Sequence, residues 1–582
     1  MMLRHAPSVP TGEPWRSRPP LSREAIARLV QFAGAFDLAT SLLPPRHGRM
    51  AALAEFMPAA GMLSARAATG AVGLLLIYLG AGLRRGKHRA WQVAVVLAGA
   101  GVVLHVAKGL DYDAAAVSAA LLVMLIAVRG RFQALADPRN RWRALLALVG
   151  FAAAGMLLGF VEIAVRMNRL DGHPGWTSWA EEAALGLIGI PGPLRFVHPL
   201  GAEAVSYTTG AFGLLAVAVA VVLLLRPGDR RPERTEADDR TLRELLDRYG
   251  SADSLGYFAL RGDKSLIWAP SAKAAVAYRV INGVSLASGD PIGAESAWPE
   301  AICAWLADCT VHGWTPAVLG CGNAGGKAYR KSGLDVVELG DEAVLDVATF
   351  SLQGRPMRGV RQAVNRIQRA AYTCQVVRQR DLAPDALAEA VRAADVFRNG
   401  AVERGFSMAL SRLGDPCDGD CLFVICRDAD GRIRGLLQFV PWGSDGLSLD
   451  LMRGDRTVDN GLTEFMVVSA VEAAPALGVR RLSLNFAVLR SVFARAEELG
   501  AGPVLRIWHR LLMLASRLWQ IESLYRANAK YRPAWQPRYL CFPTARDLPR
   551  IAVAALSAEA FLPGRRAHRE PAPVRRPVPG LA

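Results

Sequence analysis

Histidine is scarce in the C-terminal half of this 582-residue sequence, where only His312 and His509 lie between Thr241 and Pro563. Neither stands near a G-x-S-x-G or S-x-x-K pattern, which disfavours hydrolysis by a Ser–His or Cys–His pair. The eight cysteines are scattered and have no zinc-site spacing with a histidine partner. We therefore expect no metal centre, and we expect reduced thiols in a cytosolic domain.

Acidic residues are outnumbered by basic ones, 52 to 69, which gives a formal net charge of +17. Between positions 347 and 380 there is no Asp or Glu at all. Hydrophobic residues nevertheless make up 52% of the chain, and the mean hydropathy is +0.20. A basic membrane protein of this kind is expected to meet polyanions, either nucleic acid or anionic lipid.

Long apolar runs are confined to the N-terminal part and predict an all-α transmembrane bundle of about six spans over residues 28–226. The first run is the weakest, since it contains Asp37. Basic loops near residues 84–89 and 129–143 place both termini and the C-terminal domain in the cytoplasm, with the bundle in the plasma membrane. The six runs are about 28–45, 61–83, 91–108, 114–128, 145–166 and 208–226.

The remaining segments divide by composition. Residues 1–27 and 563–582 are rich in Pro and Arg and are expected to be disordered, and residues 227–240 are a charged linker. From Thr241 onward, short strand patterns alternate with amphipathic helical patterns, which predicts a cytosolic α/β or α+β domain.

One stretch of this domain, residues 446–487, has the pattern of a βαβ unit. Apolar residues alternate around Leu449 and again around Leu484, and a helical pattern runs between them after the turn Asn460-Gly461. The two strands should be parallel neighbours. Asp450 and Arg453 stand in the first strand, and both are costly to bury unless they are paired or used.

Three other segments have patterns that allow either a functional or a purely structural role. Gly320 to Lys327 matches G-x-G-x-x-G but stands alone, so a glycine-rich turn is preferred to a dinucleotide site. Residues 403–408, ERGFSM, follow an amphipathic helix and form either a pocket mouth or a helix C-cap. Residues 523–539 interleave cations with aromatic rings, a pattern that suits nucleic acid but also a packed terminal element.

Several motifs in one order resemble the synthase domain of the multiple peptide resistance factor family, the aminoacyl-phosphatidylglycerol synthases. The short N-terminal bundle is similar to that of actinobacterial members, and its few spans give no expectation of lipid flipping. The motifs are ASGDPIG at 287–293, ELGDEAVLDVATFSLQGRPMRGVR at 338–361, ERGFSMAL at 403–410, LDLMR at 449–453, NGLTEFM at 460–466, LSLNFA at 482–487 and SLYRANAKYRPAWQPRYL at 523–540.

The resemblance implies two tandem GNAT-like acyltransferase folds, at 241–375 and 376–562, with the catalytic site in the second. It implies transfer of an amino acid, lysine by family, from aminoacyl-tRNA to phosphatidylglycerol, which masks membrane charge and gives resistance to cationic antimicrobial peptides. No metal or free cofactor is implied, and aminoacyl-tRNA is a co-substrate. A separate aminoacyl-tRNA synthetase is expected to supply the donor, and a homo-oligomer is possible.

The resemblance and the residue chemistry together give a candidate site. Asp450 or Glu403 would bind the substrate ammonium group, Arg453 and Lys530 would hold phosphate, and Asn485 would orient the lipid hydroxyl or donate to the oxyanion. The catalytic candidates are Asp450, Arg453, Glu403 and Asn485; the substrate-binding candidates are Ser407, Glu464, Arg526, Lys530, Tyr531 and Arg538; the tRNA-binding candidates are Arg355, Arg358, Arg361, Arg366, Arg369 and Trp535.

Two alternatives stay open at this point. A Fem-like transferase would use the same donor but a cell-wall precursor as acceptor. A membrane-tethered lipid- or RNA-binding protein would have no turnover. The residues do not choose between lysine, alanine and arginine, since a carboxylate binds any α-ammonium group.

Overall fold

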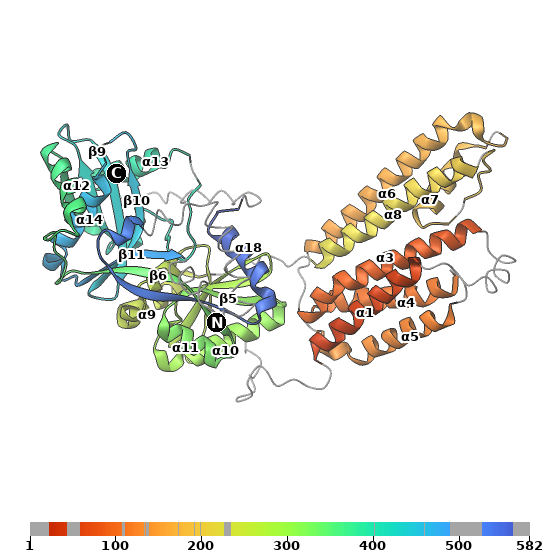
Figure 1. The fold of residues 1–582 in the computed structure, drawn as a ribbon, viewed down its shortest axis with the longest axis horizontal. Helices are drawn as coiled ribbons and strands as arrows, with labels where there is room; N and C mark the ends of the chain where they lie inside the picture. Colours follow the sequence, from red (N-terminus) through yellow and green to blue (C-terminus); the bar gives the residue numbers. More distant parts are fainter. Residues whose placement is uncertain are drawn as a thin grey trace, which may run out of the picture. The chain divides into compact units, whose positions relative to one another are not determined.

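The computed structural model describes residues 22–42, 59–107, 111–132, 134, 139–172, 174–190, 192–197, 199–225, 234–400, 402–458, 460–488 and 526–562. The two predicted disordered tails lie largely outside these residues, as does the first half of the predicted linker. The chain divides into two compact units, one formed almost entirely by residues 17–229 and one by residues after 230 (Figure 1). Each unit is described by itself.

The N-terminal unit is all helical. Within the described residues, four helices are long and apolar enough to cross a membrane, over 67–84, 88–107, 141–165 and 204–224. The first and fourth predicted runs are also helical, but the helix of the first carries Asp37 and that of the fourth has only 16 residues. The helices are α1 (Arg23–Leu42), α3 (Ala59–Arg84), α4 (His88–Ala107), α5 (Tyr112–Ala127), α6 (Arg139–Val165), α7 (Trp176–Leu187) and α8 (Pro199–Leu225).

Small residues and one polar pair join the helices of this unit. A Cβ on Gly34 of α1 would lie 2.5 Å from the carbonyl oxygen of Gly73 in α3, so glycine permits this close helix approach. Asp37 of α1 is buried and lies 2.9 Å from Nε2 of His105 in α4. The charge that weakens the first run as a span is therefore paired inside the helical unit.

The second unit is organised around one sheet of 12 strands, in the order β1-β2-β3-β5-β12-β6-β11-β10-β9-β8-β7, with β4 beside β2. Most neighbours are antiparallel, and β3–β5 and β10–β11 are parallel. The strands are β1 (Ser265–Trp268), β2 (Ala274–Ile281), β3 (Val284–Ser288), β4 (Ile292–Gly293), β5 (Thr315–Cys321), β6 (Asp335–Asp346), β7 (Thr373–Arg378), β8 (Leu422–Arg427), β9 (Ile433–Trp442), β10 (Gly446–Gly454), β11 (Arg481–Val488) and β12 (Ala534–Phe542).

Helices complete two hydrophobic cores along this sheet. One core combines α9 and α18 with strands β2, β3 and β5, and the other combines α12 and α14 with β8 to β11. Strand β12, near the end of the described chain, lies between β5 and β6, so the two halves interleave (Figure 1). The helices are α9 (Glu236–Tyr249), α10 (Trp298–His312), α11 (Asn323–Lys331), α12 (Arg358–Arg369), α13 (Pro384–Arg398), α14 (Leu462–Ala473) and α18 (Leu548–Ala558).

The predicted βαβ unit is confirmed: β10, α14 and β11 follow one another, and the two strands are parallel. Their pairing extends only from Gly446 and Arg481 to Ser448 and Ser483. Beyond that point each strand has a bulge against its other neighbour, at Asp450 in β10 and between Ser483 and Phe486 in β11. The bulges end the parallel ladder early and turn two polar side chains out of the regular strand pattern.

Candidate active site

A pocket of about 580 Å³ lies at the end of β10 where the parallel pairing has stopped. It contains three of the four predicted catalytic residues, Glu403, Asp450 and Arg453. They come from β10 and from the irregular segment after α13, and the pocket is also lined by Ala560, two residues after the end of α18. The full lining is Val402, Glu403, Arg404, Ala409, Asp450, Leu451, Met452, Arg453, Arg456 and Ala560.

Asp450 is the most perturbed acid of this pocket. Its Oδ1 accepts a 2.7 Å hydrogen bond from the backbone N–H of Leu410. Burial raises the pKa of Asp450 to about 7; the Leu410 bond opposes this shift, and the nearby negative charge of Glu403 adds to it. A carboxyl group with this pKa can take up and release a proton near neutral pH, as a general base must.

Arg453 lines the same pocket, but the structure shows no ion pair between it and Asp450. Arg453 is half-buried and has no hydrogen-bond or ion-pair partner within the described part of the chain. Arg404 and Arg456 also line the pocket, so three cationic side chains contribute to its lining. An unpaired guanidinium beside two carboxylates suits a ligand that carries both an ammonium and a phosphate group.

Asn485 lies in the β11 bulge in the left-handed region, with φ of 69°. Its Nδ2 donates a 2.6 Å hydrogen bond to the carbonyl oxygen of Leu449, the residue before Asp450. Its Oδ1 is buried and has no partner among the described atoms. The amide thus ties the two bulges together and leaves an acceptor free.

The segment that carries Glu403 is held by residues that the sequence patterns did not single out. Arg261 donates from Nη1 to the carbonyl oxygens of Gly405 and Ala409, at 2.7 and 3.0 Å. The carboxylate of Glu559 accepts the backbone N–H groups of Phe406 and Ser407. These are contacts over 144 to 153 positions of sequence, so no local pattern marks them. The structure therefore places Glu403 in a pocket wall and not at a helix C-cap.

The other substrate-binding candidates do not line this pocket. Lys530 pairs with Glu464 at 2.5 Å, so both charges are satisfied by each other. Tyr531 is 3% exposed and packs in the core beside α14, and burial raises the pKa of its hydroxyl. Ser407 is fully buried behind the loop. Arg526 is exposed at the start of its described segment, and the preceding Tyr525 lies outside the described residues.

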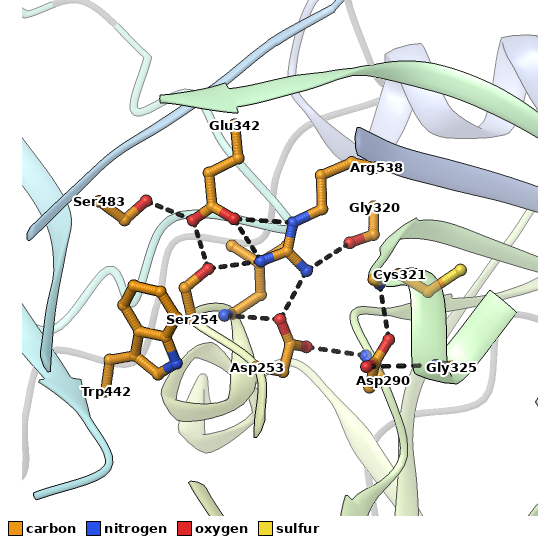
Figure 2. Close-up of polar contacts among 12 residues, drawn as sticks. Asp253, Ser254, Asp290, Gly320, Cys321, Gly325, Glu342, Trp442, Ser483 and Arg538 are labelled. Atoms are coloured by element: carbon orange, nitrogen blue, oxygen red, sulfur yellow. Dashed lines mark hydrogen bonds and ion pairs between the residues drawn. The ribbon is translucent and has the colours of Figure 1, made fainter. Parts of the chain in front are cut away.

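The prediction that Arg538 contacts substrate is wrong. All five of its N–H donors are taken by the protein, as Figure 2 shows: Nε and Nη2 bond Glu342, Nη2 also bonds Ser254, and Nη1 bonds Asp253 and the Gly320 carbonyl. The side chain is 4% exposed. Nearby carboxylates outweigh burial and raise the pKa of Arg538. Arg538 therefore holds β12 to the first half of the sheet and is not free for substrate.

The glycine-rich segment is a turn that leads from β5 into α11, as predicted. The backbone N–H groups of Gly322 and Gly325 donate to the buried carboxylate of Asp290, at 2.7 and 3.3 Å (Figure 2). A Cβ on Gly325 would lie 2.0 Å from Asp290. An internal carboxylate thus occupies the anion position at this helix N-terminus, which a phosphate would need.

The predicted tRNA-binding arginines lie on and just before α12, whose other face buries Val360, Val364 and Ile367. Arg361 is half-buried and bonds the carbonyl oxygen of Leu352. Trp535 is half-buried against the core, so its ring is not a free stacking platform. The exposed members of the set are Arg355, Arg358, Arg366 and Arg369.

Within the described residues, no cluster of three or more His, Cys, Asp or Glu side chains could hold a metal ion.

Comparisons with known proteins cover both units of the chain. Residues 243–542 match the family model described as "Phosphatidylglycerol lysyltransferase, C-terminal", and residues 21–225 match "Transmembrane region of lysyl-tRNA synthetase". A solved structure, that of L-PGS from Bacillus licheniformis, shares the fold with a TM-score of 0.50 and 20% identity, over 58% of this chain and 99% of that chain.

Curated relatives extend this similarity. The lysylphosphatidylglycerol biosynthesis bifunctional protein LysX of Mycobacterium avium (strain 104) is 51% identical over 353 residues, 61% of this chain and 30% of the relative. LysX of Rhodococcus jostii (strain RHA1) is 43% identical over 84% of this chain and 44% of the relative. The chain thus spans less than half the length of these relatives. The match over 243–542 shows that this chain belongs to the phosphatidylglycerol lysyltransferase C-terminal family, joined here to a helical membrane region.

Proposed function

We propose that this protein is an integral-membrane aminoacyltransferase that moves lysine from lysyl-tRNA to a hydroxyl group of phosphatidylglycerol. One observation carries the proposal: Glu403 and Asp450 share a pocket with three arginines, in the domain that matches the lysyltransferase family. The names of the relatives favour lysine over alanine and arginine. The coarser conclusion, a transferase domain joined to a membrane region, rests on the family matches themselves.

The reaction needs positioning more than activation, because the aminoacyl ester of tRNA is already reactive. The lipid hydroxyl oxygen attacks the ester carbonyl and forms a new ester bond. The bond from that carbonyl to the tRNA ribose oxygen then breaks, and the proton of the lipid hydroxyl ends on the ribose oxygen. No oxidant, metal or further co-substrate enters this balance.

Asp450 is assigned the proton transfer, because its pKa of about 7 lets it accept the lipid proton and return it to the leaving ribose. Asn485 is assigned the orientation of the hydroxyl. Its Nδ2 is engaged with Leu449 while its Oδ1 is free, so accepting a hydrogen bond from the hydroxyl fits better than donating one to an oxyanion.

Glu403 then remains for the lysine ammonium group, since it is a half-buried carboxylate that lines the pocket. Arg453, helped by Arg456, is assigned the phosphate of the lipid or of the tRNA terminus. Lys530 no longer shares this role, because its ammonium group is paired with Glu464.

The remaining partners follow from charge and from the membrane region. The helical unit keeps the enzyme in the plasma membrane, beside its lipid, with the catalytic domain and both termini cytoplasmic. A lysyl group adds positive charge to an anionic lipid and thereby weakens attraction of cationic antimicrobial peptides. A lysyl-tRNA synthetase supplies the donor.

A transfer assay tests the proposed function. The full chain is placed in nanodiscs that contain phosphatidylglycerol, labelled lysyl-tRNA is added, and lipids are separated by thin-layer chromatography. Label should move into a phosphatidylglycerol derivative. Binding of tRNA without transfer, or label found only in an added cell-wall precursor, would contradict the proposal.

The rate of this transfer should depend on pH with an acid limb near pH 7. Asp450 acts as a base only when deprotonated, so kcat/KM should fall as the pH drops below its pKa and level off above it. Glu403→Gln removes a negative charge that raises this pKa, so the limb should shift to lower pH while the maximal rate also falls. An unchanged limb in Glu403→Gln would contradict the assignment of Asp450.

The exposed arginines of α12 should contribute to tRNA affinity in a salt-dependent way. Arg358→Ala combined with Arg369→Ala removes two exposed cations and should raise Kd for tRNA about 10-fold. The slope of log Kd against log salt should fall by about two, since each phosphate contact contributes about one. Arg392→Ala on α13, also a helix of this domain, is the matched control, and equal effects of both changes would contradict this assignment.

A further inference from the structure

The chain that follows α18 reaches the pocket from the first half of the sheet. The carboxylate of Glu559 accepts the backbone N–H of Phe406 at 2.7 Å through Oε2 and that of Ser407 at 3.2 Å through Oε1. The next residue, Ala560, lines the pocket. The guanidinium of Arg404 lies 5.2 Å from the ring centre of Phe561. Of the three consecutive residues after α18, Glu559 and Phe561 thus contact the segment that carries Glu403, and Ala560 lines the pocket.

Helix α18 is anchored in the first hydrophobic core, which also contains the side chains of Phe406 and Leu410. Leu548, Ile551 and Ala554 are buried in the core formed with β2, β3 and β5. This helix lies beside those strands in Figure 1. Residues 548–562 also lie beyond 243–542, the part matched by the family model. The Glu559 contact is therefore a link between the first half of the sheet and the pocket that the family match does not include.

The segment held by Glu559 carries two groups of the pocket, the carboxylate of Glu403 and the N–H of Leu410 that bonds Asp450. Glu403 precedes the clamped amides, and Leu410, whose N–H bonds Asp450, follows them. Gly405 lies between with φ of +119°, a conformation that a turn here requires and that only glycine adopts without strain. A backbone of this shape needs external bonds to stay in one place, and a bidentate carboxylate supplies two of them.

The negative charge of Glu559 has a compensating neighbour. Lys264 is fully buried, donates to Ser288 Oγ at 2.6 Å and lies 4.7 Å from the ring centre of Phe406. Burial lowers the pKa of Lys264 to about 7, and the charge of Glu559 opposes this shift. The loop is thus held at Phe406 from both sides, by its amide to Glu559 and by its ring to Lys264.

We propose that Glu559 is a positioning residue for the transfer reaction: by clamping the amides of Phe406 and Ser407 it sets the distance between Glu403 and Asp450. The inference rests on the proposed function. The first half of the sheet contributes none of the proposed catalytic side chains. Through the Glu559 clamp it nevertheless builds one wall of the pocket and controls the geometry of the second half.

The test compares Glu559→Ala and Glu559→Gln with Val553→Ala, a change on the exposed side of the same helix. Glu559→Ala removes both acceptors and should lower kcat/KM about 10²-fold, the cost of a misplacement of about 1 Å. Glu559→Gln keeps one acceptor oxygen and should lose about 10-fold. In both, KM for lysyl-tRNA should rise more than KM for lipid, because Glu403 holds the donor.

Two further readouts separate positioning from a merely structural role. Arg261 still holds the carbonyl oxygen of Ala409 in these variants, so the Leu410 bond that lowers the pKa of Asp450 should persist. When Glu403 moves away, its charge no longer raises that pKa, so the acid limb of the pH–rate profile should shift to lower pH. Hydrogen exchange of the Phe406 and Ser407 amides should speed up while exchange in α18 stays as in Val553→Ala. If Glu559→Ala fails to fold, Glu559→Gln carries the comparison.

The inference would be overturned if the Glu559 variants matched Val553→Ala in kcat/KM, in the acid limb of the pH–rate profile and in amide hydrogen exchange. A loss of rate with an unshifted acid limb and a lowered thermal midpoint would also overturn it, since that pattern marks general destabilisation. If the wild-type chain transfers no lysine at all, the proposed function fails instead, and exchange at the two amides still decides whether Glu559 clamps the loop.

Discussion

Asp450→Asn is expected to lower kcat/KM for lysine transfer by about 10³-fold, within the range that one general base contributes. The amide is nearly isosteric and can still accept the 2.7 Å bond from Leu410 N–H. It cannot take a proton from the lipid hydroxyl. The loss should therefore be mainly in kcat, and steady-state transfer in phosphatidylglycerol nanodiscs measures it.

The thermal stability of Asp450→Asn should not fall with its activity, and above neutral pH it should equal or exceed that of the wild type. The folded-state pKa of Asp450 is raised from 3.8 to about 7, so the native state binds this proton more tightly than the unfolded chain does. Stability therefore falls as pH rises from about 4 to about 7, and a neutral amide removes that cost. Asp450→Asn should melt no lower than wild type at pH 8.

Asp430→Asn, the same chemical change in an exposed turn, is the control and should retain wild-type activity. Activity within threefold of wild type in Asp450→Asn would remove Asp450 from the mechanism.

Arg538→Met should produce the largest loss of stability in the second unit, about 3–5 kcal/mol, as expected when one partner of a buried ion pair is removed. The change leaves Glu342 and Asp253 buried without their shared cation (Figure 2). It also removes the bonds that join β12 to residues near β5 and β6. Chemical denaturation followed by tryptophan fluorescence of the detergent-solubilised chain measures the difference.

Arg330→Met, an exposed position on α11, is the matched control and should change stability by less than about 0.5 kcal/mol. Adding Glu342→Gln to Arg538→Met should restore part of the loss, because one of the stranded charges is then gone. Equal stability of Arg538→Met and Arg330→Met would show that the network contributes little.

The βαβ unit was predictable because its signals are local. Alternation around Leu449 and Leu484 marks two strands, and Asn460-Gly461 marks the turn before α14. The adjacency of Asp450 and Glu403 could be inferred only from the family resemblance. The bulges at Asp450 and Asn485, which turn these side chains out of register, leave no local trace in the sequence.

The sequence pattern did not predict that Arg538 and Lys530 are neutralised within the folded domain. Both lie in a basic, aromatic segment whose pattern suits nucleic acid, yet each has a carboxylate partner far away in sequence, Asp253 and Glu342 for one and Glu464 for the other. Composition shows that cations are present but not which are neutralised by folding. Arg261 and Glu559 were missed for the same reason, since their contacts with the 403–410 segment exist only in the folded chain.

Lysine transfer to phosphatidylglycerol is tested most directly by the lipid content of a host that makes phosphatidylglycerol but no aminoacylated lipid. After expression of the full chain, extracted lipids are analysed by mass spectrometry, with Asp450→Asn as the inactive control. Lysyl-phosphatidylglycerol is expected with the wild-type chain, and no detectable amount is expected with Asp450→Asn. Well-expressed, membrane-inserted wild-type protein without any aminoacylated phosphatidylglycerol would contradict the proposed function.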